Sequence, residues 1–207
     1  MPSIYTLKPR FQNALRPWVK RLFDHGVTAN QTTLLAAAGS VLVGTLVAIF
    51  ASHLWVFILV PIWMVVRMAL NAMDGMLARE FGQQTGMGAY LNELCDLLAD
   101  SALILPFLLI PEVSLALALM TTLLAWLSEY AGVMGPMVGS TRRYDGPMGK
   151  SDRAFVFGAL ATAIALGWLD AGWVNSALVL VSALLSYTIF NRVRSGLREV
   201  MECPPSA

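Results

Sequence analysis

Two apolar stretches of this sequence, 54–78 and 88–110, are interrupted by charged and amide side chains at regular spacing. Within each stretch these residues are three or four positions apart, which places each set on one face of a helix. The first set is Arg67, Asn71 and Asp74, and the second is Asn92, Asp96 and Asp100. Charged groups inside apolar helices are costly and usually mark function. The pattern therefore predicts a polar site between two apolar helices.

The stretch between Ala78 and Gly88 is short enough to be a turn, so the two helices are expected to be antiparallel neighbours. With about 1.5 Å of rise per residue, counting from the turn matches the polar residues in depth. The matched pairs are Asp74 with Asn92, Asn71 with Asp96, and Arg67 with Asp100. The first two pairs offer only oxygen ligands, which suit a hard cation such as Mg²⁺. The third is predicted to be an ion pair that closes the bottom of the site.

The composition predicts an all-α integral membrane protein. Of the 207 residues, 57% are hydrophobic and 13% charged, with a mean hydropathy of +0.65. A soluble domain has roughly a quarter of its residues charged. The formal net charge of +1 gives no reason to expect a nucleic-acid partner. Cys95 and Cys203 are far apart and predict no disulfide framework.

Six segments approach the length of about 20 apolar residues that a membrane span needs. They lie at roughly 31–51, 54–78, 88–110, 115–134, 153–170 and 174–191. The turns at 51–54, 110–114 and 170–174 contain no Lys or Arg. The positive-inside rule therefore predicts that both termini and the loops 79–88 and 135–152 are cytoplasmic.

The segment 1–25 before the first span has its own pattern. Apolar residues recur every three or four positions, at Ile4, Leu7, Phe11, Leu15, Trp18 and Leu22. Basic residues fall between them, at Lys8, Arg16, Lys20 and Arg21. This pattern is typical of an amphipathic helix that lies in the membrane interface. The helix could serve as an anchor or help lipid substrate to enter the site. The whole chain, 1–207, is predicted to be one domain, with a six-span bundle at 31–191 and a cytoplasmic tail at 192–207.

The string Asp74-Gly75-x2-Ala78-Arg79-x8-Gly88-x3-Asn92-x3-Asp96 resembles the signature of the CDP-alcohol phosphotransferases. These are six-span membrane enzymes that make phospholipid headgroups. The family pattern has aspartate at four places, two of which are Asn71 and Asn92 here. The resemblance is strongest to a branch of bacterial inner-membrane members, which implies an inner-membrane location.

The resemblance implies roles for individual residues. Asp74, Asn71, Asn92 and Asp96 occupy the positions that ligate Mg²⁺ or Mn²⁺, and Asp96 is also the general base. The CDP moiety is expected near Asp74, Gly75, Ala78, Arg79 and Gly88, with Asn30 and Thr33 from the segment before the first span. Because only two of the four carboxylates are present, we expect one firmly bound cation rather than two.

The function implied is transfer of the phosphatidyl group of CDP-diacylglycerol to a polar alcohol, with release of CMP. The alternatives are transfer from a CDP-alcohol to diacylglycerol, a non-catalytic CDP-lipid-binding relative, and a small transporter that uses Asp96 and Asp100 as proton relays. Four basic residues, Arg142, Arg143, Lys150 and Arg153, could bind an acceptor phosphate or serve only as positive-inside anchors. Glu129 is a further candidate to line the cavity. Membrane lipids are expected partners, and the sequence leaves open whether the chain forms a homodimer.

Overall fold

The computed structural model describes residues 4–202, with side chains from residue 11 onward, and this part of the chain is helical without strands. The chain divides into two compact units, each described here by itself. The first unit comprises the residues up to Leu46 together with Ile62–Leu103. The second comprises Val47–Pro61 and the residues from Ile104 onward.

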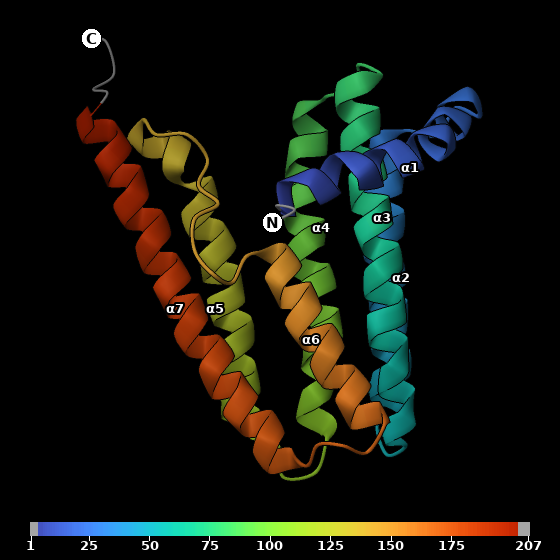
Figure 1. Cartoon of the computed structure of the whole chain (residues 1–207), viewed down its shortest axis with the longest axis vertical. Coiled ribbons are helices and arrows are strands. Elements are labelled where there is room, and N and C mark those ends of the chain that lie inside the picture. Colours follow the sequence, from blue (N-terminus) through green and yellow to red (C-terminus); the bar gives the residue numbers. More distant parts are fainter. Residues whose placement is uncertain (1–3, 203–207) are drawn as a thin grey trace. The chain divides into compact units, whose positions relative to one another are not determined.

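The first unit is built from four helices, and α1 runs crosswise to the other three (Figure 1). They are α1 (Ile4–Asp24), α2 (Ala29–Ile49), α3 (Leu59–Glu80) and α4 (Gly86–Ile104). The start of α2 is fixed by a reciprocal cap: the Gln31 amide N donates to Thr28 Oγ1, and the Thr28 amide N donates to Gln31 Oε1. A buried cluster of Val19, Ala29, Met76 and Leu77 joins α1 and the start of α2 to the end of α3.

Small residues bring α2 close to its neighbours in the first unit. A Cβ at Gly44 would overlap the backbone of Ala102, so α2 and α4 meet at the level of their backbones. One turn earlier, Gly39 leaves room for the Trp63 ring, whose Nε1 donates to Ser40 Oγ at 2.9 Å. Such contacts between small residues are the usual packing device of helices in membranes. They hold the polar faces of α3 and α4 beside α2.

The second unit contains the remaining elements. They are η1 (Leu54–Ile58), η2 (Leu105–Leu109), α5 (Leu115–Val133), η3 (Gly135–Val138), α6 (Lys150–Ala165) and α7 (Ala171–Glu202). Three fully buried rings, Phe57, Phe107 and Phe157, meet edge to face with centroids 5.3 and 5.6 Å apart. Helices α5 and α7 run side by side and share a buried hydrogen bond of 2.8 Å between Thr121 and Ser182 (Figure 1).

Four helices are long and apolar enough to cross a membrane: Ala29–Ile49, Leu54–Glu80, Leu115–Val133 and Ala171–Glu202. They correspond to four of the six predicted spans. The other two predicted spans are helical but differ from these four, because α4 carries three acidic residues and α6 has only 16 residues. The last helix continues to Glu202, so the predicted tail is helical as far as that residue. The side chains of Ile4, Leu7 and Lys8, and the whole of Cys203, lie outside the described residues.

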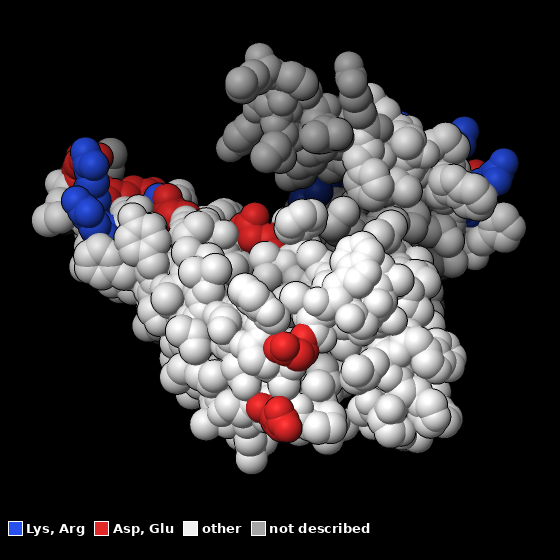
Figure 2. Space-filling model, turned by 60° about the horizontal axis from the view of Figure 1, so that its bottom comes forward, with Lys and Arg blue, Asp and Glu red and all other residues white. Residues whose placement is uncertain are grey.

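The distribution of charge on the surface follows the sequence pattern. Figure 2 shows a broad area without Lys or Arg. The Lys and Arg side chains, in blue, are seen in the upper part of this view. The three short segments that lack Lys and Arg, 51–54, 110–114 and 170–174, lie after α2, after η2 and at the start of α7. The chain is therefore a multi-pass membrane protein with an uneven distribution of basic residues.

Candidate functional site

Three helix ends meet in the first unit. The Ala29 amide N, at the start of α2, donates to Gln83 Oε1 at 2.7 Å, in the turn after α3. A Cβ on Gly88, in the first turn of α4, would lie 2.7 Å from Asn30 Oδ1. The start of α2, the end of α3 and the start of α4 are thus in direct contact. Every residue predicted to bind CDP lies on one of these three helix ends.

Asp74 is oriented by a residue from another helix. Its carboxylate is buried, with 6% exposure, and Oδ2 accepts a hydrogen bond of 2.7 Å from the hydroxyl of Thr33 on α2. A hydrogen bond to a carboxylate is stronger than one between neutral groups. Thr33 was predicted to lie near CDP, and the structure adds that it fixes the predicted metal ligand.

A buried ion cluster lies deeper between α3 and α4. Arg67 Nη1 donates to Asp100 Oδ1 at 2.5 Å, which is the ion pair expected from their matched depth. Its Nη2 also donates to Asp96, to Oδ1 at 3.0 Å and to the backbone carbonyl at 3.3 Å. All three residues are buried. The contact with the predicted general base was not expected from the sequence.

The two asparagines act differently from each other. Asn71 Nδ2 donates to Asp96 Oδ1 at 3.1 Å, so Asn71 and Asp96 are together as expected. The amide group contributes its nitrogen there, whereas a metal ligand would have to contribute its oxygen. Asn92 Nδ2 donates to Glu93 Oε1 at 2.9 Å, and Asp74 accepts from Thr33. In the expected Asp74–Asn92 pair, Asp74 is thus oriented by a residue of α2 and Asn92 by its sequence neighbour.

The outer end of this site has room and positive potential. Arg79 is exposed and folds back over Gly75, where a Cβ would lie 2.9 Å from its Nη2. Among residues 11–202, Arg79 has no ion-pair partner. The amide N of Gly88 is capped by Thr85 Oγ1 at 2.9 Å at the start of α4. A helix start with small residues and a nearby arginine is a favourable environment for phosphate groups.

The donor set fits one divalent cation. Asp74 and Asp96 provide buried carboxylates in the first unit, and Mg²⁺ is commonly bound through one or two carboxylates together with substrate phosphates. Within the described residues, no group of three or more His, Cys, Asp and Glu side chains forms a metal cluster. A cation at Asp74 would thus need further ligands from substrate or water.

The predicted phosphate-binding residues lie in the second unit, and one of them, Arg153, is paired with a buried carboxylate. Arg153 is 2% exposed and donates to Glu129 Oε1 at 3.0 Å. Glu129 also lies 3.6 Å from Nη1 of Arg192, which is equally buried. Glu129 was a candidate cavity residue, whereas sequence analysis assigned Arg192 no role. The position of Arg192 just after the last predicted span, 174–191, was the feature of the sequence that could have drawn attention to it.

The rest of this basic loop is held at the surface. Arg143 forms ion pairs with Asp145, at 2.9 Å, and with Glu199. The hydrogen bond from Arg143 lowers the pKa of the Asp145 carboxyl. Arg142 lies over the ring of Tyr144 at 5.0 Å, and Lys150 is the first residue of α6. Arg143 thus joins this loop to α7 through Glu199.

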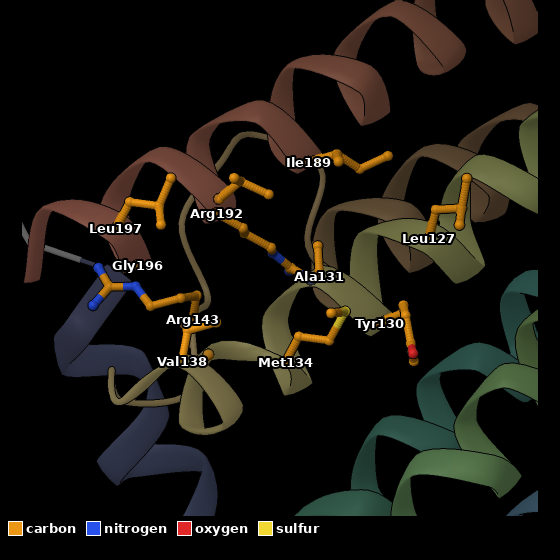
Figure 3. Close-up of a pocket in the computed structure, with 12 residues that line it drawn as sticks. Leu127, Tyr130, Ala131, Met134, Val138, Arg143, Ile189, Arg192, Gly196 and Leu197 are labelled. Atoms are coloured by element: carbon orange, nitrogen blue, oxygen red, sulfur yellow. The ribbon is translucent and has the colours of Figure 1, made fainter. Parts of the chain in front are cut away.

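An apolar cavity of about 310 Å³ lies between α5 and α7 in the second unit (Figure 3). Leu127 and Tyr130 line it from α5, Met134 lines it from the position just after α5, and Ile189 and Leu197 line it from α7. The side chains of Arg143 and Arg192 border it. Its lining is almost wholly hydrocarbon, which distinguishes it from the polar site of the first unit.

Comparison with known proteins identifies the family. Residues 26–187 match the CDP-alcohol phosphatidyltransferase family. The chain belongs to this family. It is 46% identical over 197 residues to the Escherichia coli inner membrane protein YnbA, covering 94% of this chain and 96% of YnbA. This agrees with the bacterial inner-membrane branch expected from the motif.

Two more distant members extend the family comparison. The archaetidylinositol phosphate synthase of Pyrococcus horikoshii is 27% identical over 134 residues, or 65% of this chain and 69% of that protein. A crystal structure of Mycobacterium tuberculosis phosphatidylinositol phosphate synthase (PgsA1) with CDP-DAG bound superposes with a TM-score of 0.72 at 17% identity. The superposition covers 92% of this chain and 97% of PgsA1, so the two share a fold.

Proposed function

We propose that this family member transfers the phosphatidyl group of CDP-diacylglycerol to a polar alcohol and releases CMP. The observation that carries the proposal is the convergence of Asp74, Arg79, Gly88 and Asp96 in one unit, in the motif of the family. PgsA1, with the same fold, has been crystallised with CDP-DAG and with manganese and citrate, which supports the donor and the cofactor.

In the proposed reaction, Asp96 accepts a proton and Arg79 binds the pyrophosphate of the donor. The acceptor hydroxyl attacks the phosphorus that carries the diacylglycerol, and the bond from this phosphorus to the oxygen of CMP breaks. CMP leaves with the bonding electrons, and the hydroxyl proton passes to the Asp96 carboxylate. Arg67 and Asn71 hold Oδ1 of this carboxylate in place. Arg79 binds the pyrophosphate, while Gly75, Ala78 and Gly88 leave room for it.

A divalent cation, Mg²⁺ or Mn²⁺, belongs to this proposal. Asp74 is the residue placed to hold it, with the second carboxylate at Asp96. When bound, such an ion neutralises pyrophosphate charge and polarises the phosphorus under attack. Thr33 would keep Asp74 in position for this purpose, because outer partners of metal ligands fix the ligand orientation.

The proposal includes the membrane arrangement. The chain forms one functional domain in the inner membrane, with α4 and α6 as the third and fifth of six spans and both termini cytoplasmic. The acidic residues of α4 then face protein and not lipid. Helix α1 lies in the interface, as its exposed Trp18, 5.2 Å from the Arg21 guanidinium, suits the headgroup region.

A non-catalytic CDP-lipid-binding relative is the second candidate, favoured by asparagine at positions 71 and 92. One experiment separates the candidates. The purified chain is incubated with CDP-diacylglycerol, Mn²⁺ and separate alcohols, both phosphorylated and unphosphorylated, and lipid products are identified by mass. The proposal expects a phosphatidyl-alcohol with one class of acceptor. Tight binding of CDP-diacylglycerol without any new lipid would favour a non-catalytic binding protein. A lipid product formed only from CDP-alcohol and diacylglycerol would show that the chain transfers from a CDP-alcohol to diacylglycerol instead.

A further inference from the structure

We infer that Arg67 is a built-in cation that takes the place of a second metal ion beside Asp96. The site would then operate with one divalent cation and one guanidinium. This inference rests on the proposed function, and it gives Arg67 the role of a positioning residue that acts through Asp96.

The geometry distinguishes Arg67 from an ordinary ion pair. Its two terminal nitrogens reach two different carboxylates, Asp100 at 2.5 Å and Asp96 at 3.0 Å. A third hydrogen bond, to the backbone carbonyl of Asp96, fixes the plane of the guanidinium. One carboxylate would suffice to neutralise Arg67. The second contact places positive charge directly on the carboxylate that the reaction uses.

The position of the guanidinium beside Asp96 argues against a second metal ion there. Arg67 Nη2 lies 3.0 Å from Asp96 Oδ1, and both residues of this contact, from α3 and α4, are buried. A divalent cation bound at the same oxygen would lie within a few ångströms of this fixed positive charge, and like charges repel strongly where water is excluded. A single divalent cation, held at Asp74, avoids this repulsion.

Asn71 fits the same arrangement. It donates to Oδ1 of Asp96, the oxygen that also accepts from Arg67. An ionised aspartate at this position could not donate and would place a like charge beside Asp96. Two donors one helical turn apart on α3, Arg67 and Asn71, thus hold one oxygen of Asp96. In a site with more carboxylates, a metal ion could hold this oxygen instead.

The test counts manganese ions on the purified, substrate-free chain in detergent. Mn²⁺ alone is titrated, and the free ion is followed by its electron paramagnetic resonance signal. We expect one Mn²⁺ per chain for wild type and for Arg67→Lys, which keeps the charge. Arg67→Gln should bind a second Mn²⁺, or bind Mn²⁺ at least about tenfold more tightly, because the guanidinium that repels a cation at Asp96 is then absent. Asp100→Asn, the matched control with Arg67 retained, should still bind one.

Two results would overturn the inference. One is binding of two equivalent Mn²⁺ ions by the wild type, which needs no variant to fold. The other is an Arg67→Gln protein with lower thermal stability but unchanged number and affinity of Mn²⁺ ions, which would make Arg67 merely structural. Release of CMP is measured on the same wild-type sample. A chain that binds one Mn²⁺ and gains the second in Arg67→Gln, but never releases CMP, would refute the proposed function and leave the inference standing.

Discussion

The two units each bury a three-residue ion cluster, and the clusters have opposite composition. In the first unit one arginine, Arg67, forms ion pairs with two aspartates, Asp96 and Asp100. In the second unit one glutamate, Glu129, lies against two arginines, Arg153 and Arg192. The sign that predominates in each cluster indicates the kind of ligand that the cluster would attract.

We propose that this difference in sign separates the two halves of the proposed reaction. The mainly acidic first cluster suits a divalent cation and a carboxylate base. The mainly basic second cluster suits an anion, such as a phosphate on the acceptor. Ion pairs alone do not indicate function, because Arg143 with Asp145 and Glu199 is a comparable cluster that lies at the surface.

The largest expected effect comes from removing the reactive carboxylate of the first cluster. Asp96→Asn should lower the rate of CMP release by about 10²- to 10⁴-fold, the usual contribution of a general base. Binding of CDP-diacylglycerol, measured by titration, should stay within a few fold of wild type. Glu93→Gln on the same helix is the matched control. Equal loss of binding and rate would make Asp96 first a ligand of the cation.

Breaking the first cluster at its cation should cost stability. Arg67→Met leaves two buried carboxylates without their partner, which costs about 3–5 kcal/mol of unfolding free energy. Denaturant unfolding in mixed micelles measures this loss. Adding Asp100→Leu should recover part of it, because one of the two orphaned charges is then removed. If both proteins unfold like the wild type, the cluster is not a stabilising feature.

The second cluster should respond less to the same kind of change. Arg153→Met leaves Glu129 paired with Arg192, so the charge is still balanced and we expect a loss of about 1–3 kcal/mol. The KM of a phosphorylated acceptor should rise, while the KM of CDP-diacylglycerol should not change. A loss as large as that of Arg67→Met would contradict the difference between the clusters.

The surface pair provides the smallest effect and a dependence on pH. Arg143 lowers the pKa of Asp145 in the folded protein, so this pair stabilises the fold above the ordinary carboxyl pKa near about 4. The contribution is lost as the pH falls through the lowered folded-state pKa. Because the Asp145 side chain is 35% exposed, Asp145→Asn should cost at most about 1 kcal/mol at pH 7. The difference between the two proteins should vanish in acid.

The helical spacing of polar residues was sufficient to predict the facing surfaces of α3 and α4. Arg67 lies against Asp100 and Asn71 against Asp96, because a fixed rise per residue determines depth on antiparallel helices. Four of six predicted spans have the length and composition for crossing. The limits of α4 and α6 could not be predicted as well, since acidic residues and short length weaken the hydropathy pattern.

Other contacts depend on the reach and direction of side chains, which spacing does not reveal. The long guanidinium of Arg67 spans two carboxylates a turn apart, and the Asn71 amide turns its nitrogen toward Asp96. The bond from Thr33 to Asp74 and the contact of Arg192 with Glu129 join residues 41 and 63 positions apart. Such contacts require the tertiary packing of helices that the sequence pattern does not specify.

The most direct measurement of the central claim is the release of CMP from CDP-diacylglycerol labelled in its cytidine. The purified chain is stripped of metal with a chelator, supplied with acceptor, and assayed before and after addition of Mn²⁺, with Asp96→Asn in parallel. The account predicts CMP release only by wild type and only with the cation. No release by wild type under any acceptor, or equal release by Asp96→Asn, would contradict it.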